Sequence, residues 1–392
     1  MIPSDKFIPY GKQSISDEDI RSVIEALKKP FITQGPLCRE FESKVSEKLR
    51  SNYSVAVNSA TSALHIACRA LGLKNGDILW TTPITFVASA NCGLYCGAKI
   101  DFVDIDSKTG HICIEALKIK LKNALKNNCL PKIIVPVHLT GSSCDMKEIH
   151  RLSKQYKFKI IEDASHALGA KYENEYIGNC KYSSICVFSF HPVKIITTGE
   201  GGLATTNEED LYNKMERLRS HGITKNKEDF IKEAEGPWTY EQQDLGYNYR
   251  MNDIQAALGI SQLNRLDQFV SKRNSLFENY LKLFKKQPLT MLEIPSNCYS
   301  SIHLAVIRLN NTEKKFHKHI FEQMRLNNIG VQLHYQPVHL QPYFRELGFK
   351  KGDFPNSELY GHNAMSIPLF PDLTIDEQKR VVEVFKELLS KK

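Results

Sequence analysis

The stretch that decides the fold is Y-S-V-A-V-N-S-A-T-S-A-L-H-I-A-C-R-A-L-G, residues 53–72. Its first five residues predict a short strand, and the nearly all-apolar run that ends at Gly72 predicts a buried helix. Between them lie Asn58 and Ser59, which can cap a helix because their side-chain oxygens accept hydrogen bonds from free backbone N–H groups. A strand leading directly into a buried helix indicates an α/β fold.

The alternation of strand and helix continues to residue 163. Strands are predicted at 78–82, 100–105, 132–137 and 157–163, with helices at 87–97, 115–126 and 146–156 between them. The strands are almost continuously apolar, which is typical of a parallel sheet covered by helices on both faces. We therefore expect a three-layer α/β sandwich around a mostly parallel sheet, preceded by helices at 16–28 and 39–50.

The pattern changes after residue 206. A helix is predicted from about residue 208, followed by a polar, Trp-containing loop at 224–245 and a long helix from 252 to about 285. From residue 300 the pattern is α+β, with strands at 303–309 and 331–334 and helices at 314–327 and 375–389. We place the domain boundary near residue 270: a large domain over 1–270, including an N-terminal arm over 1–50, and a small α+β domain over 271–392.

Composition excludes several classes of function. The chain has 392 residues, 42% hydrophobic and 24% charged, and its net charge of +8 is spread out rather than clustered with aromatic residues, so nucleic-acid binding is unsupported. No apolar run approaches the roughly 18 residues of a membrane span, and the N-terminus lacks an apolar signal region, which predicts a cytoplasmic protein without membrane association. The ten cysteines include no C-x-x-C pair, and the spacing of His334 and His339 does not suggest a metal site.

A second stretch, S-S-I-C-V-F-S-F-H-P-V-K-I-I-T-T-G-E-G-G-L-A-T-T at 183–206, carries the candidate nucleophile. The strand predicted at its start ends before Pro192, because proline has no N–H to donate. Lys194 follows within an apolar collar, which lowers the pKa of a lysine and makes its amine nucleophilic near neutral pH. A solvated lysine in a loop between two strands is the alternative, and this stretch alone does not exclude it.

Polar groups also follow two other predicted strands, at the edge of a parallel sheet where ligands collect. The first helical N–H groups after residue 57, with the Thr61 and Ser62 hydroxyls, form an anion site suited to a phosphate, although a capped helix would explain the same residues. Asp163 ends the strand at 157–163. It is either an ordinary cap or ion-pair partner, or the partner of a protonated ring nitrogen, as in pyridoxal-phosphate enzymes.

The order of these features resembles that of fold-type-I pyridoxal-phosphate enzymes. Four motifs add to this order: E-D-A-S-H-A-L-G-A (162–170), F-S-F-H-P-V-K-I-I-T-T-G-E-G-G (188–202), R-S-H-G (219–222) and G-Y-N-Y-R-M-N-D-I-Q-A-A-L-G (246–259). Together with them, the chain is similar to sugar aminotransferases of the DegT type from about residue 7 to near its end. A narrower resemblance, carried by I-P-Y-G-K-Q, P-I-T-F-V-A-S-A-N and L-H-Y-Q-P-V, is to the members that act on UDP-linked 4-keto sugars in pseudaminic acid biosynthesis.

The resemblance implies a role for each matching residue. Lys194 would bind the cofactor pyridoxal 5'-phosphate and carry the proton, Asp163 would keep the pyridine nitrogen protonated, and His166 would contact the ring hydroxyl. Phe86 would stack on the ring. The phosphate would be held by Thr61, Ser62 and Ser189, and by Asn248 from the other subunit of a homodimer. The remaining residues would line the nucleotide-sugar cleft: Tyr10, Phe31, Ile32, Thr33, Ala60, His334, Tyr335, Gln336 and Pro337.

The implied reaction is transfer of an amino group from L-glutamate to C4 of a UDP-linked 4-keto-6-deoxy-N-acetylhexosamine, with release of 2-oxoglutarate. An aminotransferase for another UDP- or dTDP-linked keto sugar is one alternative, and a non-catalytic regulator with the same fold is the other. A related 3-dehydratase would have histidine in place of Lys194. Motif position alone suggests Arg219 or Arg250 as the anchor of the donor's carboxylate, and His138 is expected to make a structural contact near the cofactor.

Overall fold

A seven-stranded sheet in the order β1-β9-β8-β5-β4-β2-β3 forms the centre of the computed structural model, which describes residues 6–310 and 313–390. Neighbouring strands from β8 to β3 are parallel, and β9 is antiparallel to both β8 and β1. The predicted mostly parallel sheet is therefore confirmed. In sheet order, the strands are β1 (Tyr53–Val57), β9 (Gly202–Thr206), β8 (Ile185–Ser189), β5 (Lys159–Asp163), β4 (Ile133–Ile134), β2 (Ile78–Thr81) and β3 (Lys99–Phe102).

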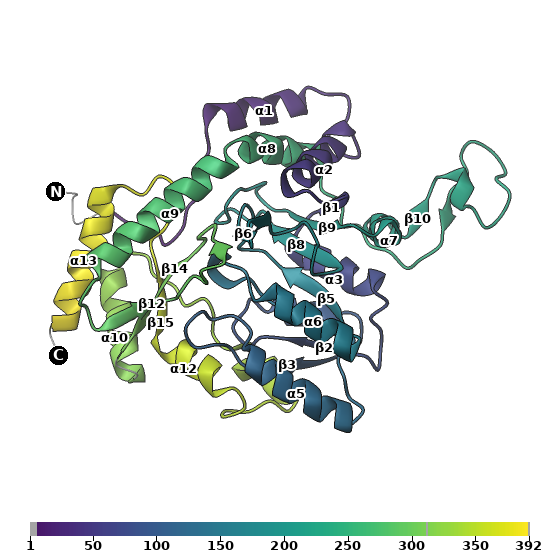
Figure 1. Cartoon of the computed structure of the whole chain (residues 1–392). Helices are drawn as coiled ribbons and strands as arrows, with labels where there is room; N and C mark the ends of the chain where they lie inside the picture. Colours follow the sequence, from purple (N-terminus) through teal and green to yellow (C-terminus); the bar gives the residue numbers. More distant parts are fainter. Residues whose placement is uncertain (1–5, 311–312, 391–392) are drawn as a thin grey trace.

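Helices cover both faces of this sheet (Figure 1). One face carries α3 (Ala60–Ala70), α4 (Ala88–Leu94) and α7 (Glu209–Arg219), and the other carries α5 (Ile114–Lys126) and α6 (Met146–Tyr156). Also packed on the second face near β8 and β9 are α2 (Pro36–Leu49) and α8 (Asp253–Asn264), with α1 (Asp17–Leu27) lying against α8. The three-layer sandwich predicted from the apolar strands is thus confirmed.

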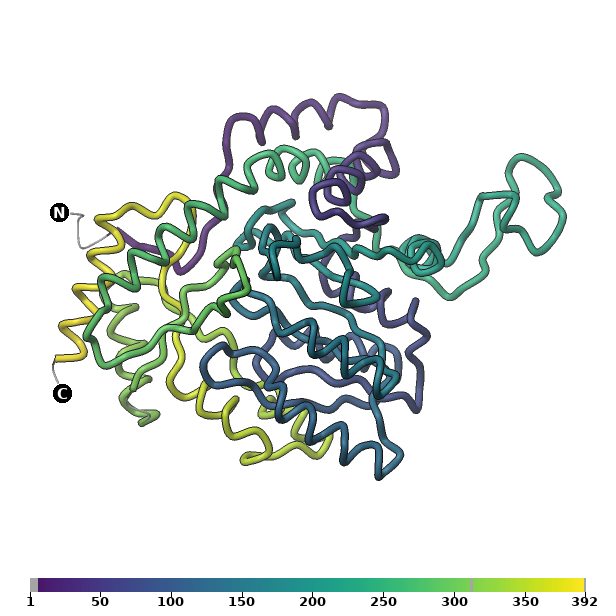
Figure 2. The backbone as a smooth tube through the Cα atoms, in the orientation of Figure 1, coloured from purple at the N-terminus to yellow at the C-terminus, as the bar shows by residue number. Residues whose placement is uncertain are grey.

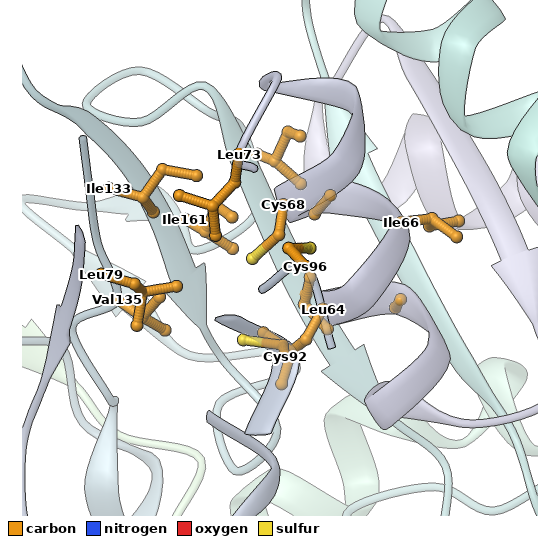
Figure 3. Packing of buried hydrophobic residues seen from close by; sticks show 14 of the residues in the cluster. Leu64, Ile66, Cys68, Leu73, Leu79, Cys92, Cys96, Ile133, Val135 and Ile161 are labelled. Carbon is orange, nitrogen blue, oxygen red and sulfur yellow. The ribbon is translucent and has the colours of Figure 1, made fainter. Parts of the chain in front are cut away.

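Successive strand residues pack on opposite faces of the sheet. Ile133 and Ile161 lie in the core under α3 and α4, whereas their neighbours Ile134 and Ile160 lie in the core under α5 and α6. Figure 3 shows the first of these cores, where Leu64 and Cys68 of α3 meet Ile133 and Ile161 of the sheet. Each buried Leu or Ile side chain contributes roughly 1.5–3 kcal/mol relative to its exposed state. A strand that is apolar at every position can supply both cores at once.

The C-terminal region has its own antiparallel sheet of β12 (Leu289–Met291), β14 (Ala305–Leu309) and β15 (Ala364–Ile367). Its core is shared with α9 (Leu266–Leu283), α10 (Lys314–Leu326) and α13 (Ile375–Ser390). This agrees with the α+β pattern read from residue 300. The domain boundary proposed near residue 270 falls inside α9, whose first turns pack on the large sheet's core and whose later turns pack on the smaller one.

Smaller elements lie at the edges of the two sheets. A three-stranded antiparallel sheet joins β13 (Cys298–Tyr299), β6 (Lys171–Tyr172) and β7 (Glu175–Tyr176). Two short helices, α11 (Pro342–Glu346) and α12 (Pro355–Asn363), precede β15.

Several predicted elements differ from the structure. The long helix predicted over 252–285 is two helices, α8 and α9, which meet at Arg265. The strand predicted at 331–334 is wrong: only Gln332 pairs, in a single bridge to Ser366, because the next residues turn away to line a cavity. The strand at 132–137 is reduced to β4 and is followed by Pro136, which has no N–H for a ladder. Helix α2 begins at Pro36 rather than near Arg39, since proline is favoured in the first helical turn.

The predicted loop at 224–245 is a projecting arm. The strands β10 (Ile223–Thr224) and β11 (Glu241–Gln242) pair antiparallel at its base, and Figures 1 and 2 show the segment between them extending away from the body. Ile231 and Trp238, which lie between these two strands in the sequence, are 80% and 74% exposed. Large apolar side chains gathered on a protruding segment are typical of a surface that contacts another protein chain.

Three further observations concern membrane-spanning helices, thiols and metal sites. Within residues 6–310 and 313–390, no helix is both long and apolar enough to cross a membrane. All ten cysteines are free thiols. Over the same residues no group of three or more His, Cys, Asp or Glu side chains has the geometry of a metal site.

A buried ion pair ties α2, β1 and α7 together. Arg219, at the end of α7 and only 8% exposed, donates to the Glu42 carboxylate and to the Ala56 carbonyl (2.7 Å). Glu42 in turn accepts from the Ala56 N–H (2.8 Å), and its own carbonyl accepts from the Ser54 hydroxyl (2.7 Å). Glu216 also pairs with Arg219. Removing the guanidinium would leave the buried Glu42 with only the partly exposed Arg39, 3.1 Å from its other carboxylate oxygen, as a cation.

We predict that Arg219→Ala lowers the free energy of unfolding by about 3 kcal/mol, because Glu42 and Glu216 then keep only the partly exposed Arg39 as a cation. Urea denaturation of the variant measures the change. The matched control is Arg217→Ala on the same helix, whose pair with Asp244 is partly exposed and should contribute at most about 1 kcal/mol. Equal losses in the two variants would contradict the argument.

Candidate active site

A cavity of about 590 Å³ lies where β5 and β8 end and α3 begins. This is the carboxyl edge of the parallel strands, as expected for a ligand site in an α/β sheet. Of the residues predicted from the sequence, ten line it together: Tyr10, Ala60, Thr61, Phe86, Asp163, His166, Ser189, Lys194, His334 and Tyr335.

Lys194 is presented by the turn that follows β8. Its backbone N–H donates to the His191 carbonyl (2.9 Å), which closes the turn around Pro192. Ile195 and Ile196 are buried in the core behind it, and Val193 lines the cavity beside it. Burial lowers the pKa of the Lys194 amine to about 8, and the charge of Asp163 opposes this shift without cancelling it. Near neutral pH the uncharged amine is therefore still the minor form, but its fraction is far larger than in an ordinary lysine.

Asp163 is the last residue of β5 and is 5% exposed. One carboxylate oxygen accepts from the Ser89 hydroxyl of α4 (2.6 Å), and the other accepts from the hydroxyl (2.6 Å) and N–H (3.1 Å) of Ser165. These three donors fix the orientation of the carboxylate. Sequence reasoning named neither serine. Ser165 could have been found, because it stands two residues after Asp163, but nothing local singles out Ser89.

His166 is held in one tautomer. Its Nδ1 accepts a hydrogen bond from the Thr140 N–H (3.3 Å), so in the neutral ring the proton lies on Nε2, 3.1 Å from the Tyr335 hydroxyl. Burial, followed by the charges of Lys194 and His334, holds its pKa well below the usual value. The ring of His303, a buried residue that sequence reasoning missed, lies 4.4 Å away and also lines the cavity.

The start of α3 forms the polar end of the cavity. Ser59 caps the helix by accepting from the Ser62 N–H (3.1 Å), which leaves Ala60 and Thr61 facing the cavity. Gly202 of β9 packs against this turn so closely that a Cβ there would lie 2.4 Å from the Ala60 nitrogen. A helix start with free N–H groups, approached by a strand without a side chain, fits a phosphate.

Several predicted residues do not line the cavity of this chain. Ser62 is buried, and its hydroxyl instead donates to Asn58 (2.6 Å), which completes the cap of α3. Asn248 is exposed at the base of the arm, where it pairs with Ser220. The remaining five lie outside the cavity lining: Phe31, Ile32, Thr33, Gln336 and Pro337.

The mouth of the cavity is aromatic. Phe86 is 57% exposed, with its ring 6.1 Å from that of Tyr335, and Tyr10 packs 5.1 Å from His334. Nδ1 of His334 lies 2.8 Å from the Ser366 hydroxyl, and burial, aided by the charge of Lys194, lowers the pKa of this ring to about 3.

His138 and Arg219 lie outside the cavity lining. Nε2 of His138 pairs with Glu162 (2.7 Å), and its backbone N–H donates to the Asp163 carbonyl (3.0 Å), so it supports the end of β5 from behind. Arg219 is occupied by Glu42 and Glu216, which removes it as the donor anchor that motif position suggested.

Known proteins share the sequence features of this site and of the whole chain. The model of the DegT/DnrJ/EryC1/StrS aminotransferase family matches residues 13–386. The chain is 37% identical over 385 residues to the UDP-4-amino-4,6-dideoxy-N-acetyl-beta-L-altrosamine transaminase of Campylobacter jejuni, covering 98% of each protein.

Two solved structures are similar over almost their whole length. One is Helicobacter pylori PseC, an aminotransferase involved in the biosynthesis of pseudoaminic acid (TM-score 0.90, 32% identity, 99% of this chain and 100% of that one). The other is the PLP form of the putative sugar aminotransferase Spr1654 from Streptococcus pneumoniae (TM-score 0.89, 27% identity, 98% and 99%).

We predict that Gly202→Ala destabilises the protein by about 1–3 kcal/mol and weakens phosphate binding, because the new Cβ displaces the first turn of α3. Urea denaturation measures the first effect, and spectroscopic titration with pyridoxal phosphate measures the second. Gly11→Ala is the control, since a Cβ there meets Val193 at an ordinary 3.5 Å. Unchanged affinity in Gly202→Ala would contradict the proposed cradle.

The reactivity of Lys194 should follow its lowered pKa. Below pH 8 the amine is mostly protonated and unreactive, so the rate at which pyridoxal phosphate labels it should rise through about pH 8 and level off above. Borohydride trapping with peptide mapping measures this rate, and exposed lysines in the same digest should show no plateau near pH 8. Asp163→Asn should move the midpoint down, since it removes the charge that raises this pKa. A midpoint near 10 in the native protein would contradict the shift.

Proposed function

The chain belongs to the DegT/DnrJ/EryC1/StrS aminotransferase family, and from this premise we propose that it uses pyridoxal 5'-phosphate to aminate a nucleotide-linked keto sugar. The donor is L-glutamate, and the acceptor is C4 of a UDP-linked 4-keto-6-deoxy-N-acetylhexosamine. The observation that carries the proposal is the meeting of a reactive lysine, a fixed carboxylate and a helix start in one cavity.

The residues of the cavity fit the cofactor. Thr61, the free N–H groups of α3 and Ser189 would hold its phosphate, at the place where Gly202 leaves room. Asp163 would face the ring nitrogen and His166 the ring hydroxyl, with Phe86 against the ring. When bound, the cofactor supplies an electron sink that lets the proton on the reacting carbon ionise.

The chain's own groups then position substrates and move a proton. Lys194, with its amine neutral in part at physiological pH, accepts the proton from the donor's reacting carbon and returns a proton later in the transfer. Ser89 and Ser165 orient the Asp163 carboxylate by donating to it, and this carboxylate would favour the protonated form of the ring nitrogen when the cofactor is bound. His166 donates through Nε2, because Thr140 occupies its other nitrogen.

The acceptor is supported by both the relatives and the cavity. The C. jejuni relative is named for a UDP-linked amino sugar, and PseC is described as acting in the biosynthesis of pseudoaminic acid. At the cavity mouth, Tyr10, His334 and Tyr335 offer rings and polar edges suited to a sugar.

We also propose that the enzyme is a homodimer with shared sites. Asn248 is exposed and outside the cavity of its own chain, so the phosphate it would bind must belong to a second copy. Phe31 is 63% exposed as well, and Thr33, two residues further on, pairs with Asn252, which follows Asn248 by four residues. The arm that ends near Asn248 carries exposed apolar residues suited to such a contact.

The proposal predicts glutamate-dependent amination of the keto sugar, with one 2-oxoglutarate formed for each amino sugar. Lys194→Ala should lose at least about 10³-fold in turnover while its urea denaturation remains cooperative. Lys181→Ala, at an exposed lysine of the same domain, should retain full activity. Appreciable turnover by Lys194→Ala would overturn the assignment.

A panel of UDP- and dTDP-linked 3-keto and 4-keto sugars tests the acceptor. We expect amination of the UDP-linked 4-keto sugar, with the new amine at C4 by NMR. Exclusive use of a dTDP-linked sugar, or an amine at C3, would contradict the acceptor while leaving the aminotransferase in place. Release of no 2-oxoglutarate with any sugar would favour a non-catalytic regulator.

A further inference from the structure

The Tyr335 hydroxyl is the last member of a row of hydrogen-bonded groups that ends in the cavity. The row begins at the Thr140 N–H, which donates to Nδ1 of His166 (3.3 Å), and Nε2 of the same ring lies 3.1 Å from the Tyr335 hydroxyl. Thr140 and His166 are 6% and 4% exposed, and both His166 and Tyr335 line the cavity. The row therefore leads from buried backbone to the space where a ligand would lie.

The direction of each hydrogen bond in this row is fixed by its first donor. A backbone N–H can only donate, so Nδ1 of His166 is an acceptor and carries no proton. The ring is neutral, because burial, followed by the charges of Lys194 and His334, holds the pKa of His166 well below its usual value. Its one N–H proton therefore lies on Nε2 and is donated to the Tyr335 oxygen.

The Tyr335 hydroxyl still has its own proton to donate. A phenol oxygen that accepts one hydrogen bond remains a donor, and burial, followed by the charge of Asp163, raises the pKa of this hydroxyl, so it stays protonated at neutral pH. Within residues 6–310 and 313–390 the hydroxyl makes no hydrogen bond other than that with His166. The chain thus presents one oriented O–H donor to the cavity and does not use it itself.

The groups around Tyr335 are those that would surround the cofactor ring. Phe86, which would lie against that ring, has its own ring 6.1 Å from the ring of Tyr335. The His166 ring lies nearly parallel to that of Tyr335, at 22° and 6.1 Å. With the ring nitrogen at Asp163 and the phosphate at the start of α3, the hydroxyl of pyridoxal phosphate is left on the opposite edge of its ring. The proposed function places His166 at that edge.

The ring oxygen and the Tyr335 oxygen would then compete for a single proton on His166. If Nε2 donated directly to the ring oxygen, the Tyr335 hydroxyl would lose its donor. If Tyr335 lies between them, every group has a partner, because its oxygen accepts from Nε2 and its proton goes to the ring oxygen. That oxygen is a strong acceptor, since a protonated ring nitrogen makes the ring hydroxyl acidic, and a hydrogen bond to an anionic oxygen is stronger than a neutral one.

We propose that the Tyr335 hydroxyl is the group that binds the ring oxygen of the cofactor, and that His166 acts through it. The proposal deepens the proposed function, on which it rests. It assigns Tyr335 a contact other than the sugar contact that the resemblance implies, and it makes His166 the residue that positions Tyr335. Thr140 has the same supporting role one step further back, because its N–H sets the tautomer of His166.

Removing the hydroxyl from either partner tests this contact without turnover. Pyridoxine 5'-phosphate has the ring hydroxyl and the phosphate but no aldehyde, so it cannot bond to Lys194, and its 3-deoxy analogue lacks only the ring hydroxyl. Calorimetry with the full-length chain, freed of cofactor, should show that the native protein prefers the hydroxylated ligand. Tyr335→Phe should weaken binding of pyridoxine phosphate by about 10- to 100-fold and leave binding of the deoxy analogue within about twofold.

Two further variants separate Tyr335 from His166. His166→Ala should reduce the preference for the hydroxylated ligand only in part, because Tyr335 keeps its proton but loses its support. Added to Tyr335→Phe, the same change should alter the preference by no more than about twofold, since a hydroxyl between Nε2 and the ring oxygen places that oxygen beyond direct reach. Tyr10→Phe, at a cavity tyrosine that is not bonded to His166, should keep the native preference.

Two results would overturn the proposal. One is a native preference for the ring hydroxyl in Tyr335→Phe, whether or not the KM for the keto sugar rises. The other is a preference that His166→Ala alone abolishes. Urea denaturation shows whether each variant is folded, and Tyr335→Leu replaces Tyr335→Phe if the latter is not. Failure of the proposed function is distinct, because the native chain would then bind neither pyridoxine phosphate nor pyridoxal phosphate and would form no 2-oxoglutarate from glutamate.

Discussion

The placement of Lys194 beside Asp163 inside one cavity is the constraint on which the rest of the structure depends. A lysine buried beside apolar residues loses its proton more readily, while a carboxylate at the same depth is costly to bury unless hydrogen-bond donors bind it. The sheet order meets both needs, because β5 and β8 are parallel neighbours whose carboxyl ends meet. Helices α3 and α4 then add the helix start and the Ser89 hydroxyl from the same face.

The anion site also requires that the first residue of β9 lie close against the start of α3. Strand β9 runs antiparallel to its neighbours, so its first residue, Gly202, lies at the edge where β8 ends at Ser189. The absence of a side chain at that point lets the helix start approach the sheet. Behind it, Arg219 and Glu42 hold β1, which leads into α3, against α2 and α7. The same contacts therefore set the position of α3 and the geometry of the anion site at its start.

Much of the fold could be predicted from the sequence because its signals are local. Apolar strands, capped helices and the order of cofactor contacts are all read within short windows, and ten predicted residues do line one cavity. Contacts between distant segments were missed: Ser89 and His303 reach the site from 74 and 140 residues away from Asp163, with no motif of their own. The prediction of a strand at 331–334 was wrong for the same reason: after the single bridge between Gln332 and Ser366, the chain turns to line the cavity. Ser62 has the right residue type, but the cap of α3 uses its hydroxyl.

The segment 247–249 has a consequence for how turnover depends on assembly. The Tyr249 hydroxyl lies 3.2 Å from Nδ1 of His65 in α3 and the Tyr247 ring stacks on that of Tyr249, whereas Asn248 between them is exposed. Under the proposed shared sites, a dissociated subunit keeps its reactive lysine and its sugar-facing rings but loses the Asn248 side chain that the second copy would bring to the cofactor phosphate. Dilution far below the dimer's dissociation constant would then lower activity reversibly: total activity would fall with the square of the protein concentration, and specific activity in direct proportion to it.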